Sequence, residues 1–191
     1  MKQHPILALS AVFALLFTGC VIRSVNPWFS PDTRVATPSP AGLWTDADAS
    51  VAVFFSPLEN NQYAVVLQNE KNEASRFTAS LHRIDSNLFL VATAPERQDL
   101  GVFATVPAHL LFRVDWGTNQ FRLFPLNLTD FQSRLARHQI TPMAGGNTTN
   151  GFILTASTDE LTEFIRAELG DAALFSEKPL YTFRAATAQK N

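Results

Sequence analysis

The chain has very little cysteine, and this scarcity is informative. It contains a single cysteine, Cys20, among 191 residues. A disulfide within the chain is therefore excluded, and a lone free thiol is unfavourable in an oxidising compartment. Cys20 lies shortly after an apolar run, and this position suggests a role for the cysteine other than disulfide formation.

The chain also lacks a strong charge of either sign. It has 15 basic and 17 acidic residues, a formal net charge of −2, and its arginines form no run. Nucleic acid is therefore not expected as a partner, because a basic surface would be needed to hold it. With 46% hydrophobic residues, the chain is too apolar to be disordered.

Motifs for catalysis and metal binding are missing as well. His82, His109 and His138 each lack a second ligand at the spacing of a zinc site. No Gly-x-Ser-x-Gly is present, and Asp46 and Asp48 fit a turn better than a catalytic pair. We therefore expect no enzyme, no metal and no cofactor, and we place His82 on a solvated strand face.

Long apolar runs are limited to one, which spans residues 6–17 and is interrupted by a single serine. As a helix, this run would reach about 18 Å, well short of the ~30 Å hydrocarbon core of a membrane. Lys2 precedes it, and the small residues Thr18 and Gly19 follow it. These are the parts of a secretory signal, so residues 1–19 are predicted to be a signal peptide.

The end of this segment, Leu16-Phe17-Thr18-Gly19-Cys20, resembles the lipobox of bacterial lipoproteins, although Phe17 stands where the pattern prefers leucine. The resemblance implies cleavage between Gly19 and Cys20, followed by acylation of Cys20. Each buried CH₂ contributes about 0.8 kcal/mol, so several acyl chains anchor the protein to a lipid bilayer. Because residue 21 is not acidic, the family rule implies the outer membrane, facing the periplasm. The alternative is an ordinary signal peptide cleaved before a buried cysteine.

Residues 20–40 are predicted to be the lipidated cysteine and a tether. Four prolines, at positions 27, 31, 38 and 40, favour an extended chain. Trp28 and Phe29 are unusual in a solvated linker, and they fit either a membrane interface or a docking contact with the domain. We expect them to dock on the domain.

Residues 41–187 are predicted to form one β-rich globular domain, followed by a tail over 188–191. Short segments rich in β-branched and aromatic residues alternate with turn signals. The clearest strand places Phe77, Ala79 and Leu81 on one face. Strands are expected at residues 51–56, 62–68, 75–84, 88–93 (apolar on both faces), 109–116, 120–126, 152–156 and 180–185.

Two short amphipathic helices interrupt the β-pattern. Thr129 is expected to cap the first, with Gln132 three residues later, and Ser157 with Glu160 the second, which Gly170 ends. About eight strands joined by hairpin-type turns predict a mainly β fold, either an antiparallel meander or a small closed barrel. An α+β arrangement is the alternative.

The aromatic residues of the strands suggest a ligand pocket. Its expected lining is Phe54 or Phe55, Tyr63, Phe77, Leu81, Phe112 and Phe121. The alternative is that these side chains simply fill the core of a small barrel.

Gly42-Leu43-Trp44 resembles the Gly-x-Trp that opens the first strand of lipocalins, whose tryptophan closes one end of the barrel. The second lipocalin hallmark, a Thr-Asp-x-x-Tyr segment, is absent. The resemblance implies a lipocalin-like barrel architecture, and an architecture does not by itself carry a function.

A broader resemblance covers most of the chain. The lipobox, "NPWFSPD", "GLW", "VPAHLLFRV" and "LTASTDEL" together are similar to a group of uncharacterised bacterial lipoproteins, which implies no particular activity. We expect an envelope lipoprotein that is a structural or protein-interaction module. The alternative is a lipocalin-like carrier of a small apolar ligand or lipid. A filled core with an exposed apolar patch would favour the first, and a cavity the second.

Overall fold

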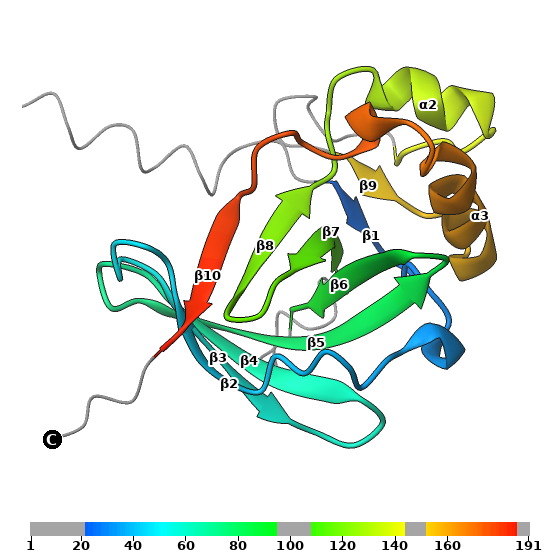
Figure 1. Ribbon diagram of the computed structural model, residues 1–191. Helices are drawn as coiled ribbons and strands as arrows, with labels where there is room; N and C mark the ends of the chain where they lie inside the picture. Colours follow the sequence, from blue (N-terminus) through cyan, green and yellow to red (C-terminus); the bar gives the residue numbers. More distant parts are fainter. Residues whose placement is uncertain (1–21, 95–107, 144–151, 187–191) are drawn as a thin grey trace, which may run out of the picture.

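The computed structural model describes residues 22–94, 108–143 and 152–186 (Figure 1). Within these ranges the chain forms a closed barrel of eight antiparallel strands, with two α-helices beside it. The mainly β fold predicted from the alternation of apolar residues is confirmed, and the meander closes into a barrel. Both hydrophobic cores lie within residues 22–186.

The barrel strands follow one another in the sheet in the order in which they occur in the chain. They are β2 (Gly42–Thr45), β3 (Ala52–Pro57), β4 (Gln62–Gln68), β5 (Ala74–Ile84), β6 (Asn87–Thr93), β7 (His109–Trp116), β8 (Gln120–Pro125) and β10 (Tyr181–Ala185). Each pairs antiparallel with the next, and β10 closes the ring by pairing with β2. Closure leaves no unpaired edge among these strands.

Several of the tight turns between strands use residues in the left-handed backbone region. Asn60 and Asn61 follow β3, Asn72 follows β4, and Asp85 follows β5, all with φ between 52° and 60°. Asparagine and aspartate tolerate this conformation better than other residues with a side chain. These residues are the turn signals that the sequence shows between the predicted strands.

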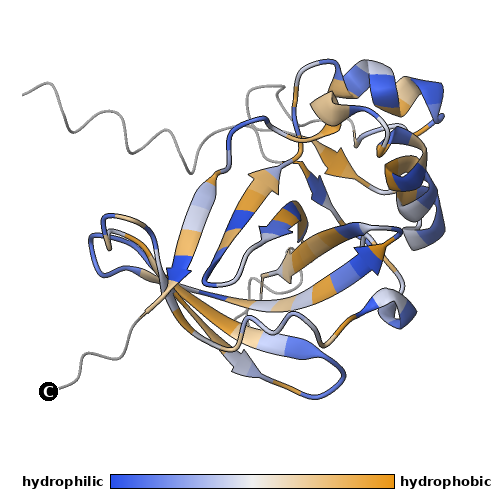
Figure 2. Cartoon of the chain, viewed as in Figure 1, coloured by the Kyte–Doolittle hydropathy of each residue, from blue (hydrophilic) through white to orange (hydrophobic). Residues whose placement is uncertain are grey.

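Successive residues along a barrel strand point alternately into the barrel and outward. In Figure 2, hydrophobic and hydrophilic residues accordingly alternate along parts of the strands. In β5, Ala79 and Leu81 join the core inside the barrel, as predicted. In β6, Leu90 points inward, whereas Phe89 and Val91 point outward into a second core. The prediction that residues 88–93 are apolar on both faces is confirmed, because this strand separates two cores.

The second core lies between the barrel wall and a helical layer. This layer contains α2 (Phe131–Arg137), α3 (Thr158–Glu168), the 3₁₀ turn η4 (Ala172–Leu174) and the short strands β1 (Arg23–Ser24) and β9 (Ile153–Leu154). A second 3₁₀ turn, η1 (Pro31–Thr33), has no buried residue. Figure 1 shows α2 and α3 together on one side of the barrel. The stripe predicted for α3 is confirmed, since Leu161, Phe164 and Ile165 are buried in this core.

The N-terminal segment contributes to the same core. Trp28 is 0% exposed and Phe29 is 1% exposed, which confirms the expectation that they dock on the domain. The Trp28 indole Nε1 donates a hydrogen bond to the His109 carbonyl oxygen at 3.0 Å. Burying an apolar side chain of this size contributes about 1.5–3 kcal/mol, so the segment is held firmly.

Two local predictions are wrong in detail. The capping residue of α2 is Asp130, in the left-handed region with no side-chain cap hydrogen bond, whereas Thr129 was expected. The Thr129 N–H donates to Asn127 Oδ1 at 3.0 Å, which forms an Asx turn directly before the helix. The strand expected over 152–156 is only β9, which lies outside the barrel and pairs in parallel with β1. The capping box of Ser157 and Glu160 on α3 is confirmed.

A buried ion-pair network joins α2 to α3. Arg134 Nη1 lies 2.5 Å from Glu168 Oε2, and both side chains are buried. Arg137 and His138 donate to the other Glu168 oxygen, Oε1, each at 2.9 Å. Burial alone would raise the pKa of Glu168, but the hydrogen bonds from His138, Arg137 and Arg134 outweigh it and hold the pKa below its ordinary value.

Candidate functional site

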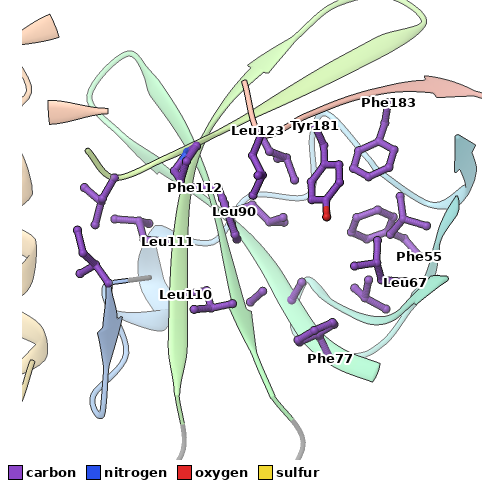
Figure 3. Close-up of a pocket in the computed structure, with 18 residues that line it drawn as sticks. Phe55, Leu67, Phe77, Leu90, Leu110, Leu111, Phe112, Leu123, Tyr181 and Phe183 are labelled. Carbon is purple, nitrogen blue, oxygen red and sulfur yellow. The ribbon is translucent and has the colours of Figure 1, made fainter. Parts of the chain in front are cut away.

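A cavity of about 230 Å³ occupies part of the barrel interior (Figure 3). Aliphatic and aromatic side chains from seven of the eight barrel strands, all except β2, and from adjoining segments form its wall. The lining residues are Ile22, Val53, Phe55, Val65, Leu67, Phe77, Ala79, Leu90, Ala92, Leu110, Leu111, Phe112, Leu123, Pro125, Leu126, Leu180, Tyr181 and Phe183. Such a wall suits an apolar ligand and offers water almost no hydrogen bonds.

Among the described residues that line the cavity, the Tyr181 hydroxyl is the one polar side-chain group. Figure 3 shows its oxygen pointing toward the cavity. The Tyr181 ring packs against Phe183, with ring centroids 5.2 Å apart. Burial, together with the Asp46 carboxylate, raises the pKa of Tyr181 above its ordinary value. The hydroxyl therefore stays protonated at neutral pH, where it can donate a hydrogen bond to a ligand.

The cavity extends from the barrel interior to the boundary with the second core. Most lining residues belong to the interior core or pack against it, but Ile22, Leu111 and Leu126 belong to the core under the helices. Several lining side chains keep part of their surface exposed, and Leu180 is 40% exposed. The cavity is thus open on one side, with Leu180 at its rim.

Aromatic side chains fill the rest of the barrel interior. Trp44 packs edge-on against Trp116 and Phe121, with centroids 5.6 Å and 4.9 Å away, and its indole donates to the Pro40 carbonyl oxygen at 2.7 Å. Gly42 precedes it with φ of 114°, a conformation that favours glycine. None of these aromatic residues lines the cavity, so this cluster confines the free space to the remaining part of the barrel.

The structure brings part of the predicted pocket together. Phe55, Phe77 and Phe112 line the cavity, as predicted. Tyr63, Leu81 and Phe121 point into the barrel but lie in the filled part. Phe54 is 47% exposed and belongs to the outer surface, so of the two alternatives, Phe54 or Phe55, the second holds.

The predicted lining consisted mainly of aromatic residues and omitted the aliphatic part of the wall, and two of the other omissions are informative. Tyr181 and Phe183 lie on β10, a strand that was expected but whose inward face was not assigned. Their period-two spacing was a usable signal, because both fall on one side of that strand. Ile22 gives no such signal, since its place at the cavity depends on the pairing of β1 with β7 and β9.

Comparisons with protein-family models, with curated proteins and with solved structures find no match to this chain. The site must therefore be judged on its own geometry.

The prediction that His82 lies on a solvated face is wrong. Its side chain is buried beneath the N-terminal segment, where Phe29 packs against the ring at 5.4 Å. Thr33 Oγ1 donates to the Ser30 carbonyl oxygen, so it accepts from His82 Nδ1 at 2.7 Å. Nε2 is then free to accept the Ser80 hydroxyl at 2.8 Å. Burial, with a smaller contribution from Arg34, lowers the pKa of His82 to about 4.

The hydrogen bond between Ser80 and His82 resembles that between a catalytic serine and its general base, but the pair differs from a catalytic pair in its surroundings. Both side chains are buried, and neither lines the cavity. Catalysis needs a substrate within reach of such a pair. The other ring nitrogen of His82 bonds to Thr33, and this hydrogen bond fastens residues 29–34 to the outer face of β5.

The other titratable residues considered from the sequence have local partners. His109 Nδ1 lies 2.8 Å from Thr93 Oγ1, and His138 joins the Glu168 network described above. Asp46 accepts hydrogen bonds from Ser50 and from the Val51 N–H, which confirms its place in a turn. In the part of the chain that the structure describes, no group of three or more potential metal ligands occurs.

The predicted cleavage and lipidation site, Gly19 and Cys20, lies outside the described residues. Within residues 22–94, 108–143 and 152–186, no helix has the length and apolar character needed to cross a membrane.

Proposed function

We propose that the barrel binds a small apolar ligand, and that the protein is an envelope lipoprotein held through an acylated Cys20 at the outer membrane, facing the periplasm. The lipid bilayer is then its partner on the anchor side. The observation that carries the proposal is the open cavity with its apolar wall and single hydroxyl. This arrangement is typical of sites that fix a ligand by shape and orient it with one polar contact.

The volume of the cavity sets the size of the ligand. An apolar cavity of about 150 Å³ is enough to hold benzene, with six carbons. By the same ratio, 230 Å³ accommodates about nine carbons. Pockets for drug-sized ligands are larger, at ~300–1,000 Å³. The proposed ligand is therefore either small or a longer molecule that inserts only one apolar end.

A second function, a protein-interaction module, has one observation in its favour. Leu43 and Phe54 are cross-strand partners on the outer face of β2 and β3, and they are 48% and 47% exposed. Val66 on β4 extends the row. Exposed apolar neighbours of this kind mark contact surfaces in many proteins. We rank this function second because the row is small.

Blocking the cavity tests the proposed function. Ala92 lines the cavity, and Ala92→Phe would place a ring in it. Ala64→Phe is the matched control, because Ala64 does not line the cavity and neighbours Val66 on the outer face of β4. Residues 20–191 of each form would be purified from a native-like bacterial host and examined by native mass spectrometry.

We expect a bound apolar molecule on the wild type and on Ala64→Phe, released by organic solvent, and none on Ala92→Phe. A ligand that stays on Ala92→Phe would place binding elsewhere on the protein. If the wild type carries no ligand and takes none up from an offered lipid extract, the proposed function is wrong and the protein-interaction module takes its place.

A further inference from the structure

We propose that the ligand is an acyl chain, presented to the cavity from the N-terminal side of the same molecule. Its source is either the lipid on Cys20 or the bilayer in which that lipid is inserted. The inference rests on the proposed function and on the predicted lipidation. It is carried by the position of Ile22, which follows Cys20 by two residues in the sequence and forms part of the cavity wall.

Ile22 is held firmly in this place. It is 5% exposed in the second core, and the next residues form β1 between β7 and β9. The Arg23 N–H donates to the Phe152 carbonyl oxygen at 2.8 Å, and the Val25 N–H donates to that of Leu154 at 2.9 Å. These contacts fix the position of Ile22 at the cavity.

Chain length then limits how far the anchor is from the cavity. Cys20 precedes Ile22 by two residues, and an extended chain spans at most about 3.6 Å per residue. The Cα atom of an acylated Cys20 is therefore within about 7 Å of the Cα atom of a cavity-lining residue. An acyl chain of nine or more carbons attached there is long enough to enter the cavity.

The energetics favour an exchangeable occupant. A chain that leaves water for the cavity gains about 0.8 kcal/mol per buried CH₂. A chain that leaves the bilayer for the cavity gains little, because lipid tails are as apolar as the cavity wall. Tethering raises the effective concentration of the anchor's own chains to the millimolar range or above.

Photochemical crosslinking in membranes tests this inference. The full chain would be produced in a bacterial host that processes lipoproteins, with benzoylphenylalanine in place of Leu180 at the cavity rim. The matched control carries it in place of Phe54, which has a similar exposure, 47% against 40%, on the outer wall. Both positions are exposed at the surface, so both variants are expected to fold. After irradiation, peptides containing the probe are analysed by mass spectrometry.

We expect an acyl adduct at position 180, its absence at position 54, and its loss when Ala92→Phe is added. A phospholipid on the peptide identifies the bilayer as the source, whereas a crosslink to the N-terminal lipopeptide identifies the anchor of Cys20. No acyl adduct, with 1-nonanol still binding to residues 20–191 and blocked by Ala92→Phe, would overturn the inference and leave the proposed function standing. If 1-nonanol also fails to bind, the proposed function fails with it.

Discussion

The affinity of the cavity for straight-chain 1-alkanols should depend on chain length in two stages. Each added methylene that is buried contributes about 0.8 kcal/mol, which is a factor of about four in the dissociation constant. The cavity of 230 Å³ accommodates about nine carbons. Affinity should therefore rise about fourfold per carbon up to about nine carbons and then level off, because further methylenes stay in water.

The chain length at which the affinity levels off, called the break below, should depend on the size of the cavity. Leu67 lines the cavity and is half-buried, so Leu67→Ala removes three carbons from the wall at a modest cost in stability. The break should move by about three carbons toward longer alkanols. Leu43→Ala, an equal truncation on the outer wall, should leave it unchanged.

Isothermal titration calorimetry on residues 20–191, with alkanols of increasing length below their solubility limits, measures both effects. A steady rise through the longest alkanols would show adsorption to an extended surface instead of a bounded cavity. A break that moves in Leu43→Ala but stays in Leu67→Ala would refute the assignment of the binding site.

Three further predictions concern single residues. Tyr181→Phe should weaken 1-nonanol binding about fivefold, from the loss of a hydrogen bond worth about 1 kcal/mol, and calorimetry measures this. His82 has a pKa of about 4 in the folded protein against 6.5 ordinarily, so the unfolded chain takes up its proton first as the pH falls. Its contribution to stability is complete above pH 6.5, and about 3 kcal/mol is lost on reaching pH 4, a slope that urea unfolding of His82→Asn should lack. Glu168→Gln should lower the free energy of unfolding by about 3 kcal/mol, because Arg134 and Arg137 lose the buried carboxylate that they share and Arg134 keeps only Asp171 as an ion-pair partner.

The structure supplies a control for the Glu168 prediction. Asp115→Asn breaks the exposed pair with Arg122 and should change the free energy of unfolding by less than about 1 kcal/mol. A similar loss in Asp115→Asn and Glu168→Gln would contradict the importance assigned to burial. If Tyr181→Phe and the wild type bind 1-nonanol equally well, the Tyr181 hydroxyl does not contribute to ligand binding.

Local patterns predicted the elements of this fold well. The alternation over β5 and the double apolar face of β6 depend on residues close together in the chain, and so does the capping box of Ser157 on α3. Asp130 shows the limit of such patterns, because α2 begins one residue later than the capping spacing of Thr129 predicts, at a left-handed residue with no side-chain cap.

Long-range pairing determined what the sequence could not show. His82 lies on the polar face of its strand, and it is buried only because residues 29–34 cross over it. The cavity combines Phe55 and Phe77, which a pattern of aromatic residues predicted, with Ile22 and Tyr181, which meet them only when the barrel closes. How much of the barrel interior is filled depends on how Trp44 and its neighbours pack. The alternation of apolar residues in the sequence does not predict that packing.

The central claim, that an apolar chain occupies the barrel interior, can be tested most directly by locating a bound chain. Methyl groups of residues 20–191 would be observed by NMR while a nitroxide-labelled fatty acid is added. The account predicts that the methyl signals of Val65, Leu90 and Leu123, which line the cavity, broaden first, whereas those of Leu43 and Val66 on the outer wall stay sharp. Broadening centred on Leu43 and Val66, with the signals from the cavity unchanged, would contradict it.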